Sequence, residues 1–222
     1  MSGHGLLAML GLVLALADGR PACAASNAQL PARTVFEMAA ALDRLAPEER
    51  DAIRLQHRLR ALTPGEDLRL WYVEQGRRVD VPLLADGRFE RPAALARADV
   101  AATMHANRPL DDLDLNIDLL VQLPDGREFR YADLTRAAAQ MNGFAKRQAG
   151  FAGVFAPKVH SLQFRCEQRP DCALTVHLPA GARTYLPDAK DRIVLRLSAA
   201  LKDANPRITT VQPFAEIVGA MD

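Results

Sequence analysis

Apolar and polar residues alternate from Leu113 to Leu123, the cleanest run of this kind in the chain. Leucine, isoleucine or valine occupies every second position, whereas Asp114, Asn116 and Asp118 lie between them. Because successive side chains of a strand point to opposite faces, this pattern predicts a half-buried strand. Shorter runs predict further strands at 53–61, 68–73, 79–83, 100–106, 128–131, 192–197 and 208–214, with another around Phe89.

Turns that contain glycine or proline separate these runs, for example Gln75-Gly76 and Ala85-Asp86-Gly87. Short strands joined by such turns are typical of antiparallel sheets. The run at 53–61 also fits a helix, but its polar residues fall at every second place, which favours a strand. We therefore expect a mainly β (α+β) protein built as an antiparallel β-sandwich.

Two segments change to a helical period. In the first, Thr34 and Glu37 form a T-x-x-E capping-box pattern, and the helix should end before Pro47. The second runs over 133–148, although Gly143 weakens it. The expected organisation is a signal peptide at 1–24, a leader and helix at 25–50, and a single β-rich domain at 51–222.

The N-terminus predicts export. An apolar run covers 6–17, too short to cross a bilayer comfortably, and Ala22-Cys23-Ala24 has the small-residue pattern of a cleavage site, with Ala25 as the first mature residue. A core helix is the alternative. Arginine greatly outnumbers lysine, which is typical of a GC-rich bacterial genome. We therefore expect a periplasmic or secreted bacterial protein with no transmembrane segment after signal removal.

Signal removal leaves Cys166 and Cys172 as the cysteines of the mature chain. An even number of cysteines in an exported protein favours a disulfide. Alternating runs flank the turn at 167–171 between them, so we expect one hairpin from 158 to 179, closed by that disulfide. A redox pair or a zinc site is less well supported by this spacing.

The composition is that of a globular protein: 49% of residues are hydrophobic, 25% are charged, and the net charge is +1. This charge gives no sign of a nucleic-acid surface. Asp112, Asp114, Asn116 and Asp118 resemble the start of a calcium loop, but Ile117 stands where that loop needs glycine. We expect a solvated acidic strip and no metal site; a weak cation site would need further acids nearby.

The expected hairpin brings Ser161 opposite His177, which raises the possibility of a nucleophile and base, and places His160 on the other face. A surface polar pair is the simpler interpretation, so no catalytic residue is assigned. Neighbouring strand residues Trp71 and Tyr72 should face opposite ways, one of them into the core.

Two other features bear on function. Phe151, Val154 and Phe155 lie between glycines and would form either a binding lip or part of the core. Since no catalytic constellation emerges, we expect a non-enzymatic accessory protein of the cell envelope, a binding or structural module without a cofactor whose partner is an envelope protein or an apolar ligand. The alternatives are a periplasmic hydrolase with a site assembled from distant loops and a carrier of an apolar small molecule.

Overall fold

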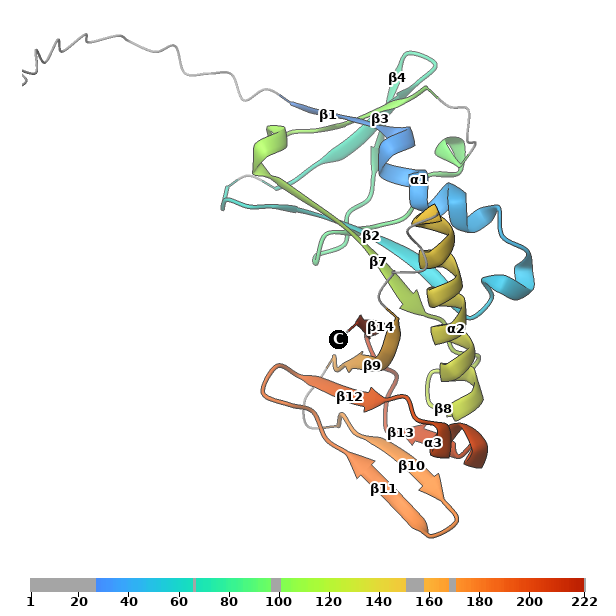
Figure 1. Ribbon diagram of the computed structural model, residues 1–222. Coiled ribbons are helices and arrows are strands. Elements are labelled where there is room, and N and C mark those ends of the chain that lie inside the picture. The colour runs from blue at the N-terminus through green and yellow to red at the C-terminus, as the bar shows by residue number, and fades with distance from the viewer. Residues whose placement is uncertain (1–26, 66, 97–100, 151–157, 168–170, 222) are drawn as a thin grey trace, which may run out of the picture.

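The computed structural model describes residues 27–65, 67–96, 101–150, 158–167 and 171–221 of the chain. The expected signal peptide with its cleavage site at Ala24 and Ala25, and the glycine-flanked aromatics at 151–157, lie outside these residues. Within them the strands form three sheets, all with antiparallel pairing. Figure 1 shows β2 and β7 crossing the middle of the molecule, between one sheet on one side and the C-terminal strands on the other.

The central sheet has six strands in the order β12-β9-β14-β7-β2-β5. Its longest ladder joins β2 and β7 from the pair Ile53–Val121 to the pair Ala61–Leu113. The strands are β2 (Ile53–Ala61), β5 (Arg88–Phe89), β7 (Leu113–Val121), β9 (Val159–Arg165), β12 (Arg192–Arg196) and β14 (Glu216–Met221).

Two four-stranded sheets pack against this central sheet. The N-terminal one has the order β1-β6-β3-β4, with β1 (Ala28–Pro31), β3 (Leu70–Glu74), β4 (Arg77–Val81) and β6 (Thr103–Ala106). The C-terminal one has the order β11-β10-β13-β8, with β8 (Glu128–Arg130), β10 (Leu174–Leu178), β11 (Gly181–Tyr185) and β13 (Arg207–Thr210).

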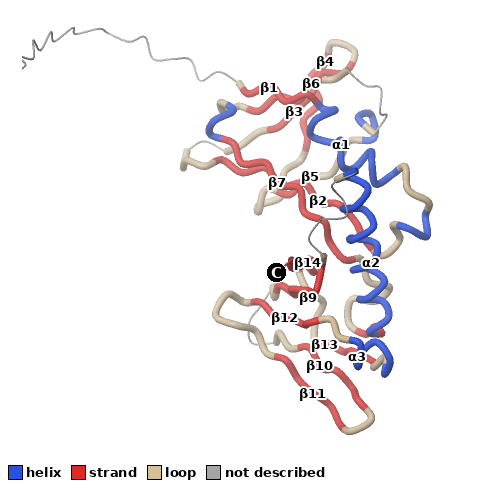
Figure 2. Tube along the Cα trace, viewed as in Figure 1, coloured by secondary structure: helices blue, strands red, loops and turns tan. Residues whose placement is uncertain are grey.

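The α-helices lie along one side of the molecule (Figure 2). They are α1 (Ala32–Asp43), α2 (Tyr131–Gln148) and α3 (Ala199–Ala204), with short 3-10 turns η1 (Pro47–Glu49), η2 (Ala93–Leu95) and η3 (Leu110–Asp112). The predicted first helix therefore exists, but it starts two residues before Thr34, after Pro31, and no side chain caps it. The expected Thr34 capping box is thus wrong.

Buried apolar side chains form two clusters, one at each end of the β2–β7 ladder. The C-terminal cluster joins α2 to the central and C-terminal sheets; Tyr131, Leu134, Leu162, Phe164, Leu174, Ile193 and Ile208 are among its members. The N-terminal cluster joins α1 to the N-terminal sheet; Val35, Phe36, Leu59, Leu70, Tyr72, Phe89 and Met104 are among its members. Both clusters depend on β2, because Ile53 belongs to the first and Leu59 to the second.

The mainly β class, with an N-terminal helix and an inserted helix, is confirmed. The sandwich stays a prediction, because the described strands are divided among three sheets. β2 has the expected limits, whereas β1, β11 and β14 were not expected. In particular, β1 lies in what looked like a polar leader, and it pairs with β6.

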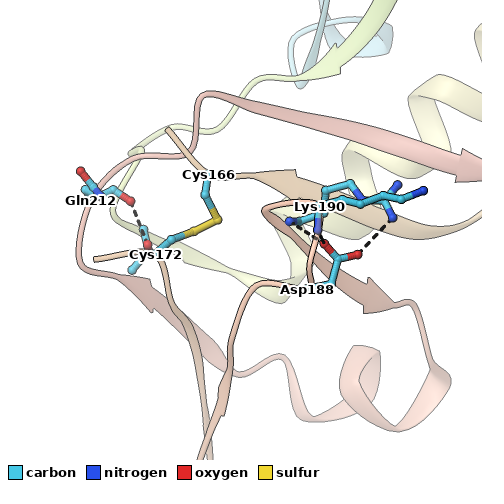
Figure 3. The surroundings of a disulfide bond; sticks show 7 residues. Cys166, Cys172, Asp188, Lys190 and Gln212 are labelled. Atoms are coloured by element: carbon cyan, nitrogen blue, oxygen red, sulfur yellow. Dashed lines mark hydrogen bonds and ion pairs between the residues drawn. A yellow bond between two sulfur atoms is a disulfide. The ribbon is translucent and has the colours of Figure 1, made fainter. Parts of the chain in front are cut away.

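The hairpin expected at 158–179 is wrong, although its disulfide is confirmed. β9 belongs to the central sheet and β10 to the C-terminal sheet, and each pairs with other strands. Cys166 and Cys172 therefore connect two sheets, with their Cα atoms 5.8 Å apart. Figure 3 shows this bond close to the turn in which the Asp188 carboxylate accepts a hydrogen bond of 2.8 Å from the Lys190 backbone N–H. Alternation predicted the strands, but it does not specify the partner of each strand.

Candidate functional site

A cleft of about 1200 Å³ opens beside the first half of β2. One wall is the C-terminal half of α1 with residues 47–51, and the opposite wall runs from β4 to η2. The lining includes both apolar and charged groups: Ala39, Leu42, Asp43, Arg50, Asp51, Ile53, Arg54, Leu55, Gln56, His57, Val81, Pro82, Leu84, Arg88, Phe89, Glu90, Arg91 and Pro92. Such a volume is large for a small-molecule pocket.

β7 pairs along one edge of β2, and β5 covers only part of the other edge. This strand pairs with β2 only at His57 and Arg58. Beyond them the Leu59 N–H donates to the Gly87 carbonyl at 2.9 Å. Gly87 has a φ of +84°, and a Cβ atom there would collide with the Leu59 carbonyl oxygen. Glycine is therefore required for the close approach that holds this half of β2.

The other half of the edge stays open because the chain turns away after Phe89. Beyond Phe89, the Arg91 side chain forms an ion pair with Asp43 at the end of α1. Pro92 follows and has no N–H with which to continue a ladder. Among the described strands, none pairs with this side of β2 from Ile53 to Gln56.

The backbone of Leu55 faces this open side. In an antiparallel ladder, hydrogen-bonding groups alternate between the two edges of a strand. The Leu59 N–H points to the β5 side, whereas the Ala52 carbonyl accepts from Gln122 on the β7 side at 2.8 Å. By this alternation the N–H and C=O of Leu55 point toward the cleft, and its side chain is half-buried there.

His57 lies at the closed end of the cleft and is 4% exposed. Its ring packs edge-on against Phe36, with centroids 5.0 Å apart, and near Phe89 at 5.5 Å. Nε2 has no hydrogen-bond partner among the described residues. Burial and the positive charge of Arg91 lower the pKa of His57 to about 4, and a hydrogen bond to the Val35 backbone opposes them only partly. The ring is therefore neutral at physiological pH.

Most charged groups of the cleft are paired. Asp43 binds Arg91 and lies 3.7 Å from Arg50. Asp51 binds Arg136 from α2, and Asp80 binds Arg78 at 2.7 Å. Two charged side chains of the cleft, Arg54 and Glu90, differ from these.

Arg54 and Glu90 have no ion pair within the described part of the chain. Arg54 is exposed, and its guanidinium donates only to Gln56, at 3.3 Å. Glu90 is also exposed, where the chain leaves β2. The cleft thus presents to solvent one positive and one negative side chain that form no ion pair with the described residues of its walls.

A buried charge network supports β2 on the side opposite the cores. Glu216 of β14 is 6% exposed and binds Arg58, and it accepts from Arg165 at 3.0 Å and from Gln56 at 3.3 Å. Arg58 also lies 3.5 Å from Asp118. Because β2, β7, β9 and β14 all contribute, this network fixes the position of the strand that forms one side of the cleft.

The described lining of the cleft is poor in nucleophilic side chains. Among the described residues that line it there is no serine, threonine, cysteine or lysine. His57 has no carboxylate partner within the described chain, and a base whose pKa is near 4 is weak at neutral pH. The available groups are instead a strand edge, apolar walls and two opposite charges, which together suit recognition of a ligand.

The acidic residues singled out in the sequence do not converge. Asp112 accepts from the Thr63 hydroxyl at 2.6 Å, and this bond is the main reason that its pKa is lowered. Asp114 accepts from Asn116 at 2.7 Å, and Asp118 contacts Arg58. In the described part of the chain no cluster of three histidine, cysteine or acidic side chains could hold a metal ion.

The Ser161–His177 pair is also wrong. Ser161 is buried in β9 opposite Arg196 and Ala220. His177 lies in β10 of another sheet, where its Nε2 is 2.9 Å from the Thr209 hydroxyl. The two side chains were placed together only by the hairpin that does not form.

Trp71 and Tyr72 do face opposite ways, as expected. Tyr72 is buried in the N-terminal cluster, whereas Trp71 stacks on His105 with ring centroids 5.7 Å apart. The guanidinium carbon of Arg78 lies 4.1 Å from the centroid of the Trp71 ring. The expected lip of Phe151, Val154 and Phe155 lies outside the described residues. The cleft itself was not expected, because the sequence does not show that β5 ends early.

No family model matches this chain, and neither a curated protein nor a solved structure is detectably similar to it. Within the described residues, no helix has both the length and the apolar character needed to cross a membrane.

Proposed function

We propose that this protein is an exported, non-enzymatic binding module of the cell envelope, and that its ligand occupies the cleft beside the first half of β2. The observation that carries the proposal is the open edge of β2 within a large cleft whose walls hold apolar and unpaired charged groups. Ligand sites commonly combine apolar walls with a few polar groups that fix orientation.

Export is supported by two independent features. The Cys166–Cys172 disulfide suits an oxidising compartment, and the apolar run at 6–17 followed by Ala22-Cys23-Ala24 suits a signal peptide. In a bacterium both fit the periplasm or the medium. We expect the protein recovered from its native host to begin at Ala25 or a neighbouring residue.

A hydrolase is the alternative function, since a site could be assembled from loops outside the cleft. No specific observation favours it, and the lining of the cleft supplies no nucleophile. The alternative of a carrier for an apolar molecule depends on Phe151 and Phe155, which lie outside the described residues. Neither alternative uses the open strand edge.

The test is a nuclear magnetic resonance titration of the mature, isotope-labelled protein with a concentrated extract of the host cell envelope. The proposal expects reversible shifts at residues 50–57 and 79–92, and no chemical change in the extract that needs the protein. A variant with Ala39→Trp, which fills one wall of the cleft, should lose these shifts while keeping its fold by circular dichroism. Turnover of an extract component, or shifts confined to other surfaces, would contradict the proposal.

A further inference from the structure

We infer that the cleft binds an extended peptide segment of a partner protein, which adds as a strand to the open edge of β2 and places an acidic side chain beside Arg54. This inference rests on the proposed function, because it names the ligand class of the same cleft. It commits to a partner peptide; a second copy of this chain or a small molecule is an outcome of the test.

The backbone provides the first argument. From Ile53 to Gln56 the β5 side of β2 has no strand partner among the described residues, although β7 pairs fully with the other side. The Ile53 N–H on this side already donates to the Arg50 carbonyl at 3.2 Å, so the Ile53 C=O and the Leu55 N–H and C=O are the groups left for a short extended peptide. A peptide in line with β5 would accept from the Leu55 N–H and donate to the Leu55 carbonyl, as in other strand-addition complexes.

The pleat of β2 provides the second argument. Residues directly opposite each other in a ladder place their side chains on the same face. Leu55 faces the apolar side of the cleft, which Ala39 and Leu42 also line. A peptide residue opposite Leu55 should therefore be apolar, and its two neighbours should point to the polar face, where Arg54 and Gln56 lie.

Charge provides the third argument and sets the identity of those neighbours. Arg54 has no ion pair in the described chain, so a residue opposite it should be acidic. If the β5 register is continued past Phe89, Glu90 lies opposite Gln56. A second acid there would be repelled. The expected motif is thus one acidic residue flanked by apolar residues.

The probe follows from this motif. It is the blocked peptide acetyl-Thr-Val-Glu-Val-Thr-amide, whose symmetric pattern fits either strand direction, and its control has lysine in place of glutamate. Each is titrated into the labelled full-length mature protein and followed by resonance shifts and amide hydrogen exchange. We expect the glutamate peptide to bind about fivefold more tightly, which is the upper range for an exposed ion pair. Exchange at Leu55 should slow, whereas Gln56, which faces β7, should not change.

Two variants separate the peptide site from a general charge effect. Arg54→Glu should reverse the preference between the two peptides. Arg60→Glu changes another exposed arginine on the same face of β2, outside the cleft, and should leave the preference unchanged. Circular dichroism and sedimentation velocity should show that both variants keep the fold and oligomeric state of the wild type.

Each outcome decides the inference. Equal affinity for the two peptides, an effect of Arg60→Glu equal to that of Arg54→Glu, or shifts at another strand edge would overturn it. Dimerisation through residues 53–57 without peptide would assign the cleft to a second copy instead. If neither peptide binds while the envelope extract still shifts the cleft resonances, the peptide inference fails and the proposed function stands; if nothing shifts them, both fail.

Discussion

The two halves of β2 have the same alternation and the same neighbour on one side, yet they differ along the other edge. From His57 to Leu59 the strand lies between β7 and β5, and the Leu59 N–H binds the Gly87 carbonyl. From Ile53 to Gln56 only β7 pairs with it. One half is therefore an interior strand of the sheet, and the other is a strand edge within a cleft.

A few residues of the β5 segment make this difference. Gly87 permits close approach to β2, whereas Pro92, which follows Arg91, has no N–H with which to continue a ladder. Exposed edges are generally a liability, because they can pair with other chains. An open edge enclosed by the walls of a cleft restricts that pairing to a ligand that fits between them.

The largest expected effect comes from the charge network that positions both halves. Glu216→Ala removes the carboxylate that binds Arg58 and Gln56, leaving Arg58 buried with only Asp118 nearby. The free energy of unfolding should fall by about 3–5 kcal/mol, measured by chemical denaturation.

The control for this substitution is Arg165→Ala. Arg165 also binds Glu216, but its side chain is 46% exposed, so its loss should cost no more than about 1 kcal/mol. Equal costs for Glu216→Ala and Arg165→Ala would show that burial of the network does not determine its contribution.

His57 adds a pH dependence at the boundary between the two halves. Its pKa is lowered from 6.5 to about 4, so the unfolded chain binds a proton more readily than the folded one. The stabilisation is complete above pH 6.5 and is lost as the pH falls toward 4, a change of about 3 kcal/mol. The difference in unfolding free energy between the wild type and His57→Leu should change by this amount between pH 7.5 and pH 4. A constant difference would contradict the burial of His57.

The Cys166–Cys172 disulfide lies outside both halves of β2. Replacing Cys166 and Cys172 by serine removes a short loop closure that connects two sheets, and stability should fall by about 2 kcal/mol by the chain-entropy relation. Hydrogen exchange under native conditions should keep the ranking of the β2 amides unchanged. A selective loss of protection at Leu59 would mean that the disulfide controls the closed half of β2.

The last substitution changes the closed half of β2 alone, and its most informative effect is local. Gly87→Ala introduces a Cβ at a φ of +84° against the Leu59 carbonyl, and should cost about 1–3 kcal/mol. Because the strain falls on the contact with β5, exchange at Leu59 should become faster while Gln56 stays protected by β7. Gly76→Ala is a matched control, because Gly76 also has a positive φ but nothing lies within 4 Å of the added atom.

The sequence predicts individual strands better than their partners. Alternation gave the limits of β2, and cysteine parity gave the disulfide, because each depends on residues close in the chain or few in number. β11 was missed because it is almost wholly exposed and has no apolar face. β14 contains Gly219, where a side chain would meet Val159 and Met141, so its pattern is interrupted for a packing reason.

The cleft could not be predicted for a different reason. β5 ends at Phe89, and Arg91 just beyond it binds Asp43, a residue 48 positions away at the end of α1. Pro92 is a local sign that a ladder stops, but the sequence does not show that the segment before it pairs with β2 or that a cleft opens beyond it. Similarly, the Ser161–His177 hypothesis failed because the two strands belong to different sheets, which depends on contacts across the whole chain.

The central claim is that the first half of β2 is an open edge that receives a strand. Hydrogen exchange at Leu55 and Leu59, whose N–H groups point to the same side of β2, tests it most directly. In the free protein we expect Leu55 to exchange much faster than Leu59, and the glutamate peptide to slow Leu55 alone. If Leu55 were as protected as Leu59 without peptide, the edge would be closed and the account would be wrong.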